Sequence, residues 1–135
     1  MRISKSFVVN QLPAILVAIV LFILSSIPYP TPVILNVNHE DLIMHAIAYS
    51  AFGFFVARAL YYQKGCIRFR ENLLLFTFLV GTIYGISDEI HQYFVPYREA
   101  DFFDVVADAL GAACGVGLYH YWLLPKILKY RAKRH

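Results

Sequence analysis

The sequence contains little charge and little cysteine. Charged residues fill only 16% of the 135 positions, and the two cysteines, Cys66 and Cys114, stand in different contexts, so we assign no disulfide. No glycine-rich phosphate-binding loop, Cys-x-x-Cys pair or His-Glu-x-x-His element is present, which removes support for a nucleotide enzyme or a zinc protease. The net charge of +3 comes without a nucleic-acid-binding motif, so no nucleic-acid partner is expected.

Hydrophobic residues dominate instead. They make up 59% of the chain, and the mean hydropathy is +0.57, as is typical of a membrane protein. Crossing about 30 Å of hydrocarbon takes roughly 20 helical residues, and four apolar runs of that size are separated by polar segments. The sequence therefore predicts an all-α integral membrane bundle with transmembrane helices at residues 7–27, 41–62, 72–94 and 102–124, the last ended by Pro125.

The chain is expected to form a single domain over its full length. Because Arg2 and Lys5 precede the first apolar run, that run has an alternative interpretation as a cleaved signal peptide. Ser25 and Ser26 are the small residues at which cleavage would then occur. The tail 125–135 is basic and could lie on anionic lipid, although a topology signal is the simpler interpretation.

Basic residues predict the orientation. Eleven of the 12 Lys and Arg residues lie before the first run, around the connection between the second and third runs, or after residue 125; Arg98 alone faces the other side. All the acids except Glu71 lie at or near that other side. Because segments rich in Lys and Arg stay in the cytoplasm, both termini are predicted to be cytoplasmic. The acidic helix ends then face the outside of the cytoplasmic membrane.

The second run carries a polar stripe. Asp41, His45 and Tyr49 recur every fourth residue, which places them along one slowly drifting face of a helix. A histidine in such a position can serve as an interhelical hydrogen-bonding residue. Beside a carboxylate, His45 could instead act as a general acid or base.

The third run ends in two adjacent acids. Asp88 and Gln92 share one helix face, and Glu89 lies on its flank. Ionised carboxylates repel each other at low dielectric. Asp88 and Glu89 should therefore share a proton, pair with Arg98, or hold a cation.

The fourth run has the sharpest periodicity. Within about 80° of one helix face it carries Asp101, Asp104, Asp108, Gly111 and Gly115. The two glycines allow another helix to approach closely. Three carboxylates on the same face have no role in packing alone, so they require a partner, a proton or a metal ion.

These side chains together predict one acidic pocket. The expected catalytic residues are His45, Asp88, Glu89 and Asp104. The expected substrate-binding residues are Asp41, Tyr49, Gln92, Arg98, Asp101 and Asp108. A divalent cation is one option, and its candidate ligands are Asp88, Glu89, Asp104 and Asp108. Metal-free proton transfer by His45 is another, and a serine nucleophile at Ser87 beside His91 is a weaker one because no oxyanion element accompanies it.

The motifs resemble those of the VanZ-like family of small bacterial membrane proteins. The residues that carry the resemblance are Asp41, His45, Tyr49, Gly85, Asp88, Glu89, Gln92, Pro96, Arg98, Asp101, Asp104 and Gly111, together with Ser25-Ser26-Ile27-Pro28. The chain departs from the family pattern at Leu42, Tyr97 and Asp108, where Lys, Gly and Asn are common. The family is named for a protein implicated in low-level resistance to the glycopeptide teicoplanin, so the resemblance implies a role at the outer envelope face.

Three functions remain open at this point. The first is an enzyme that acts on a phospholipid or a lipid-linked cell-wall precursor, with His45 or a carboxylate moving protons and Arg98 clamping the substrate. The second is a protein that binds or translocates a lipid, a glycopeptide antibiotic or a cation without covalent change, using the acids as a proton or ion relay. The third is a structural polar network that specifies helix pairing, in one chain or in an oligomer.

Overall fold

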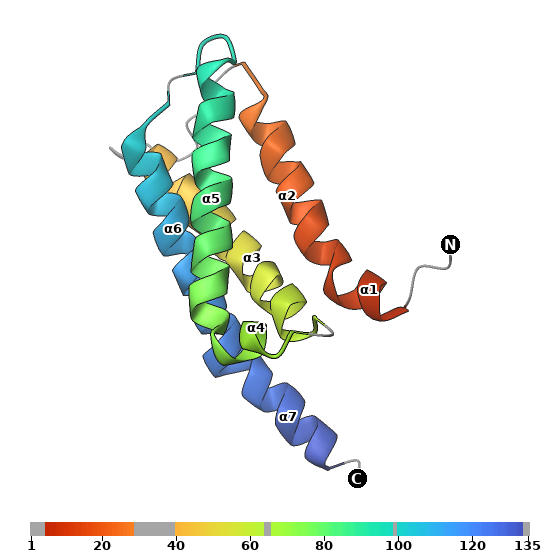
Figure 1. Cartoon of the computed structure of the whole chain (residues 1–135). Helices are drawn as coiled ribbons and strands as arrows, with labels where there is room; N and C mark the ends of the chain where they lie inside the picture. Colours follow the sequence, from red (N-terminus) through yellow and green to blue (C-terminus); the bar gives the residue numbers. More distant parts are fainter. Residues whose placement is uncertain (1–4, 29–39, 64–65, 99, 134–135) are drawn as a thin grey trace.

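A computed structural model describes residues 5–28, 40–63, 66–98 and 100–133, and every element in these ranges is helical. The elements are α1 (Lys5–Asn10), α2 (Leu12–Ser25), α3 (Glu40–Tyr61), α4 (Arg68–Glu71), α5 (Leu73–Tyr93), α6 (Phe102–Gly117), a π-helical segment (Leu118–Leu123) and α7 (Leu124–Ala132). Figure 1 shows α5 lying beside α6, with α3 behind them and α2 slanting along the other side of the bundle.

Three helices are long and apolar enough to cross a membrane, namely Asp41–Tyr61, Leu73–Tyr93 and Phe102–Tyr130. Their outer surfaces are apolar: Ile47, Ile83 and Leu110 are each more than 60% exposed. Side chains of this kind would be costly in water but suit contact with lipid tails. The prediction of an all-helical chain with membrane-compatible helices is therefore confirmed for the described residues, with three such helices where four were predicted.

The first predicted span is divided into two helices. Pro13 lies in the first turn of α2 and has no N–H to donate to Val9. The chain bends there, with α1 and α2 meeting at Gln11 (Figure 1). The 14 residues of α2 extend about 21 Å, which is less than the hydrocarbon thickness. By length and composition, α2 alone does not qualify as a span.

Glycines hold the three long helices together. A Cβ placed on Gly111 of α6 would collide with the backbone of Ala46 in α3. A Cβ on Gly115 would collide with the backbone of α3 one turn further on, at Ser50 and Phe54. The two residues that the sequence assigns to packing therefore form the contact that brings α3 and α6 together.

The long helix that begins at Phe102 does not end at Pro125, contrary to the prediction from sequence. Before the proline the helix widens into the π-helical segment, in which the N–H of Leu124 reaches the carbonyl of Tyr119. Since Pro125 cannot donate a backbone hydrogen bond, this wider turn lets the chain pass it and continue as α7. The basic tail predicted at 125–135 is thus helical through Ala132.

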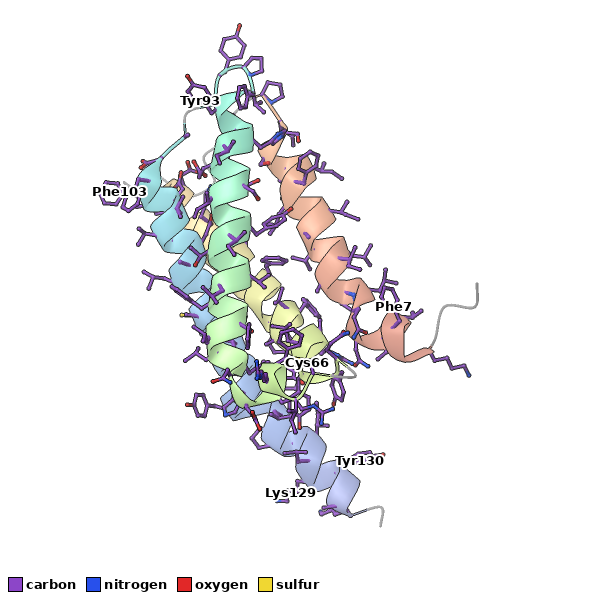
Figure 2. All side chains as sticks on the ribbon, viewed as in Figure 1. Phe7, Cys66, Tyr93, Phe103, Lys129 and Tyr130 are labelled. Atoms are coloured by element: carbon purple, nitrogen blue, oxygen red, sulfur yellow. The ribbon has the colours of Figure 1, made fainter. Side chains whose placement is uncertain are left out.

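The two ends of the bundle differ in character. Helices α1, α4 and α7 lie toward one end, and the connection between α5 and α6 lies at the other (Figure 1). Figure 2 shows Tyr93 and Phe103 near the α5–α6 connection, with Cys66, Lys129 and Tyr130 at the opposite end. The end with the α5–α6 connection is called the acidic end below. The start of α3, the end of α5 and the start of α6 bring to it the described acidic side chains of Asp41, Asp88, Glu89, Asp101, Asp104 and Asp108.

Candidate functional site

The centre of the acidic end is a contact between α3 and α6. His45 Nδ1 lies 2.9 Å from Oδ1 of Asp108, and the carboxylate accepts the Nδ1–H hydrogen bond. Asp108 is completely buried, whereas the His45 side chain is 12% exposed. Gly85 of α5 makes room for this carboxylate, because a Cβ there would lie 2.7 Å from Asp108 Oδ2. The glycine and the aspartate are thus matched across the α5–α6 interface.

The other side of the His45 ring faces two more acids. Nε2 of His45 lies 4.0 Å from Asp41 Oδ1, one helical turn earlier on α3. A ring nitrogen of His45 and one oxygen each from Asp41 and Asp104 lie within 4.8 Å of one another. Asp104 is 5% exposed, and Asp41 is open to solvent. The imidazole therefore lies between a buried carboxylate and a more accessible pair.

Asp88 and Glu89 are bridged by an amide. The Nε2 of Gln92 donates to Asp88 Oδ2 at 3.2 Å and to Glu89 Oε1 at 3.3 Å. Among the three partners expected from sequence, Arg98 is not the one observed: in the described parts of the chain no carboxylate pairs with an arginine or a lysine. Gln92 orients the two acids but brings no positive charge.

Arg98 binds the end of α2. Its Nε donates to the carbonyl of Ile27 at 3.1 Å, and its Nη2 donates to the carbonyl of Leu24 at 3.1 Å. The last carbonyls of a helix have no partner within the helix, so a guanidinium can satisfy them. Arg98 thus ties the α5–α6 connection to α2 and leaves Nη1 for other contacts.

Asp101 has a structural role in this arrangement. Its side chain accepts from the N–H of Phe103 at 2.8 Å and caps α6. Its own N–H donates to Glu89 Oε2 at 2.8 Å. Asp101, which was predicted to bind substrate, and Glu89, which was predicted to be catalytic, therefore fix where α6 begins relative to α5.

A cavity of about 100 Å³ opens beside the His45 ring. Its polar lining consists of Ser25, Asp41, His45, Tyr49, Asp88, Gln92 and Arg98. Its apolar lining includes Leu21, Leu24, Met44 and Ala48. The space suits a few waters or the polar part of a headgroup, and it is smaller than the pockets that enclose a whole ligand.

Two buried oxygens next to the cavity lack hydrogen-bond partners among the described residues. They are the hydroxyl of Tyr49, which is 1% exposed, and Oδ2 of Asp108. Leaving such groups unsatisfied costs free energy, on the order of 1–3 kcal/mol each for neutral groups and more for charged ones. Of the two residues, Tyr49 lines the cavity, so its hydroxyl is available to whatever enters, whereas Asp108 lies outside the lining and is closed to solvent.

The contribution of α2 to the site was missed from sequence, because the first run was expected mainly to complete the packing of the bundle. Tyr84 of α5 donates to the carbonyl of Ala18 at 2.6 Å. His91 of α5 lies 2.9 Å from the Ser26 hydroxyl, so it does not pair with Ser87, which donates to its own helix. The pattern Ser25-Ser26 was the one available signal, because it places hydroxyls at the acidic end.

The structure groups the candidate metal ligands differently from the sequence prediction. Asp104 joins Asp41 and His45, while Asp108 and Glu89 form a second group with the same histidine. Asp88, a predicted ligand, belongs to neither group among the described residues. His45 is the residue that both groups share, and it was not among the predicted metal ligands.

A family model described as VanZ/LLP1 matches residues 7–124 of the chain. The chain belongs to the VanZ/LLP1 family. The match spans all ten predicted site residues, and it confirms the resemblance found in the sequence motifs. No curated protein and no solved structure matches this VanZ/LLP1 chain. Together with the three membrane-compatible helices, the family identifies a VanZ-like membrane protein.

Proposed function

We propose that this VanZ-like protein acts on the polar headgroup of a phospholipid or a lipid-linked cell-wall precursor at the outer face of the cytoplasmic membrane. The observation that carries the proposal is the cavity at the acidic end. One of its walls is apolar, formed in part by Leu21 and Leu24 of α2, and its floor is built from carboxylates and an imidazole. A lipid has the same two-sided character.

The chemistry assigned to this site is proton transfer by His45. Asp108 holds the ring through Nδ1 and fixes the orientation of Nε2. The Nε2 atom can then take a proton from water or from a substrate hydroxyl and return it to a leaving group. A carboxylate behind a histidine serves this purpose in many hydrolases, by orienting the ring and stabilising its protonated form.

The proposed orientation places the acidic end outside the cell. The opposite end carries Arg58, Arg68 and Arg70 near α4, and Lys126 and Lys129 on α7. This distribution supports a cytoplasmic location for that end. Within a bilayer, α1 and α2 would together form the fourth span, since 5–25 contains 21 positions in the two helices and the bend between them. Both termini would then be cytoplasmic.

The test compares lipids in cells that express different variants. His45→Gln and Asp88→Asn remove site groups, while Glu71→Gln changes an exposed acid at the opposite end as a matched control. We expect wild type and Glu71→Gln to change the mass profile of envelope lipids and to raise teicoplanin tolerance, and both site variants to lose the two effects.

Another outcome would overturn the enzymatic assignment. If the lipid masses stay the same in all strains while teicoplanin tolerance still depends on His45, the site binds or translocates its ligand without changing it. If neither site variant differs from wild type in tolerance or lipids, the polar groups serve helix pairing alone.

A further inference from the structure

The acids at the acidic end carry more negative charge than the described residues neutralise. Asp104 and Asp108 are 95% or more buried, and no arginine or lysine pairs with either in the described ranges. A buried carboxylate without a compensating charge is costly in a protein interior and more so in a membrane. His45 is the one basic group in contact with them among the described residues, so the remaining charge has to be removed by a proton or balanced by a further cation.

Hydrogen bonding separates the acids into two kinds. Oε1 and Oε2 of Glu89 accept bonds from Gln92 and Asp101, and Oδ1 of Asp108 accepts the bond from His45. By contrast, the carboxylate of Asp104 accepts no hydrogen bond within the described part of the chain, although it is 5% exposed. Oδ2 of Asp108 is also without a hydrogen-bond partner, but it is closed to solvent. The free carboxylates that lie closest to solvent are therefore Asp104 and Asp41, and the buried one of these two points to a missing cation.

From these free ligand atoms we propose that Asp41, His45 and Asp104 bind a divalent transition-metal ion, such as Zn²⁺ or Mn²⁺, at the mouth of the cavity. One atom from each residue lies within 4.8 Å of the other two. Ligands about 2.1 Å from one ion lie roughly 3–4 Å apart, so small side-chain movements close the site. Two carboxylates and a neutral imidazole balance the charge of the ion.

Asp108 acts as a positioning residue in this site. By accepting the Nδ1–H bond at 2.9 Å it leaves the lone pair of the His45 ring on Nε2, the nitrogen that lies 4.0 Å from Asp41. Carboxylates hold metal-binding histidines in this way in many proteins. The alternative group of His45, Glu89 and Asp108 is less suitable, because both oxygens of Glu89 already accept hydrogen bonds. The free Oδ2 of Asp108 is closed to solvent.

Three protein ligands leave coordination positions open to the cavity. The Asp41 side chain is 67% exposed, so the ion has a route in and a water or headgroup oxygen has room to bind. The inference rests on the proposed function and uses the same cavity. With Nε2 of His45 held as a metal ligand, the proton-transfer role passes to a carboxylate of the cavity such as Asp88. The metal site implies that the headgroup is bound through a phosphate or hydroxyl oxygen on the metal.

The test measures metal binding by the purified full chain without a histidine tag, after removal of bound metal with a chelator. Titration with Zn²⁺ or Mn²⁺ alone should give one equivalent per chain. Asp41→Asn and Asp104→Asn should each weaken binding at least about tenfold, and Asp108→Asn about 10–100-fold. Glu71→Gln is the matched control, since it removes an exposed acid at the opposite end of the bundle, and it should bind as wild type does.

Several results would overturn the site. One is metal binding well below one equivalent per chain, and another is unchanged metal binding in Asp41→Asn. A third is Ca²⁺ and Mg²⁺ binding as tightly as Zn²⁺ and Mn²⁺, because it would show that no imidazole nitrogen is a ligand. Asp41 is exposed, so its variant should fold even if Asp104→Asn does not. Lipid turnover that persists in chelated protein would refute the metal site and leave the proposed function intact. Metal binding without a lipid change would support the metal site and refute the proposed function.

Discussion

His45 Nδ1 and Asp108 Oδ1 lie 2.9 Å apart, although 63 positions separate the two residues in sequence. The contact joins α3 to α6 in a setting where Asp108 is fully buried. We predict that His45→Ala and Asp108→Ala are coupled by about 1–2 kcal/mol in the free energy of unfolding. A double-mutant cycle in detergent measures this coupling. Additive effects, like those expected for His45 combined with the distant Glu71→Ala, would contradict the contact.

Gly115 tests the packing of α3 on α6. We predict that Gly115→Ala lowers the free energy of unfolding by about 2 kcal/mol or more, because its Cβ would meet the backbone of Ser50 and Phe54, which cannot rotate away. Gly117→Ala is the control two residues further on. Nothing lies within 4 Å of a Cβ there, so the substitution should be neutral or stabilising. Equal effects at the two glycines would show that α3 does not lie against α6 as described.

Tyr84 tests the attachment of α2 to the bundle. Tyr84→Phe removes the hydrogen bond to the Ala18 carbonyl and keeps the ring, so a loss of about 0.5–1.5 kcal/mol in unfolding free energy is expected. The control is Tyr93→Phe, at a side chain that is 72% exposed and should have no measurable effect. If Tyr84→Phe unfolds like wild type, α2 is held by other contacts.

Thiol labelling tests the orientation. With Cys114 replaced by Ala, Tyr93→Cys places a thiol at the acidic end, while native Cys66 remains at the opposite end (Figure 2). A membrane-impermeant maleimide should label intact cells at residue 93, and it should reach Cys66 only after permeabilisation. Labelling of Cys66 in intact cells without labelling at 93 would reverse the proposed topology.

The sequence predicted the long helices well because their boundaries depend on local signals. The second and third runs match α3 and α5 closely, since polar residues stand where each helix begins or ends. Pro125 was misjudged for a reason that no local rule contains: a single wide turn lets a helix pass a proline. Hydrophobic periodicity shows which face of a helix is buried. How far the helical hydrogen bonding continues past a proline depends on the folded chain.

The sequence predicted which residues belong to the site better than it predicted which of them contact each other. Helical spacing placed His45 and Asp108 on inward faces, but it could not show that they meet each other. Arg98 was expected to clamp a substrate or to pair with an acid. In the structure it binds the backbone carbonyls of Leu24 and Ile27 at the end of α2, and no sequence pattern marks a carbonyl as an acceptor. The apolar wall from α2 was missed for the same reason, because Leu21 and Leu24 look like any lipid-facing leucines.

Filling the cavity tests the central claim most directly, because it leaves every polar group of the site in place. Ala48 of α3 lines the cavity, whereas Ala51 on the same helix is exposed. Envelope lipids are compared by mass between cells expressing equal amounts of wild type, Ala48→Phe and Ala51→Phe, with melting curves to confirm folding. We predict that wild type and Ala51→Phe produce the same lipid change and that Ala48→Phe produces none. A folded Ala48→Phe protein that changes the lipids as wild type does would contradict the account.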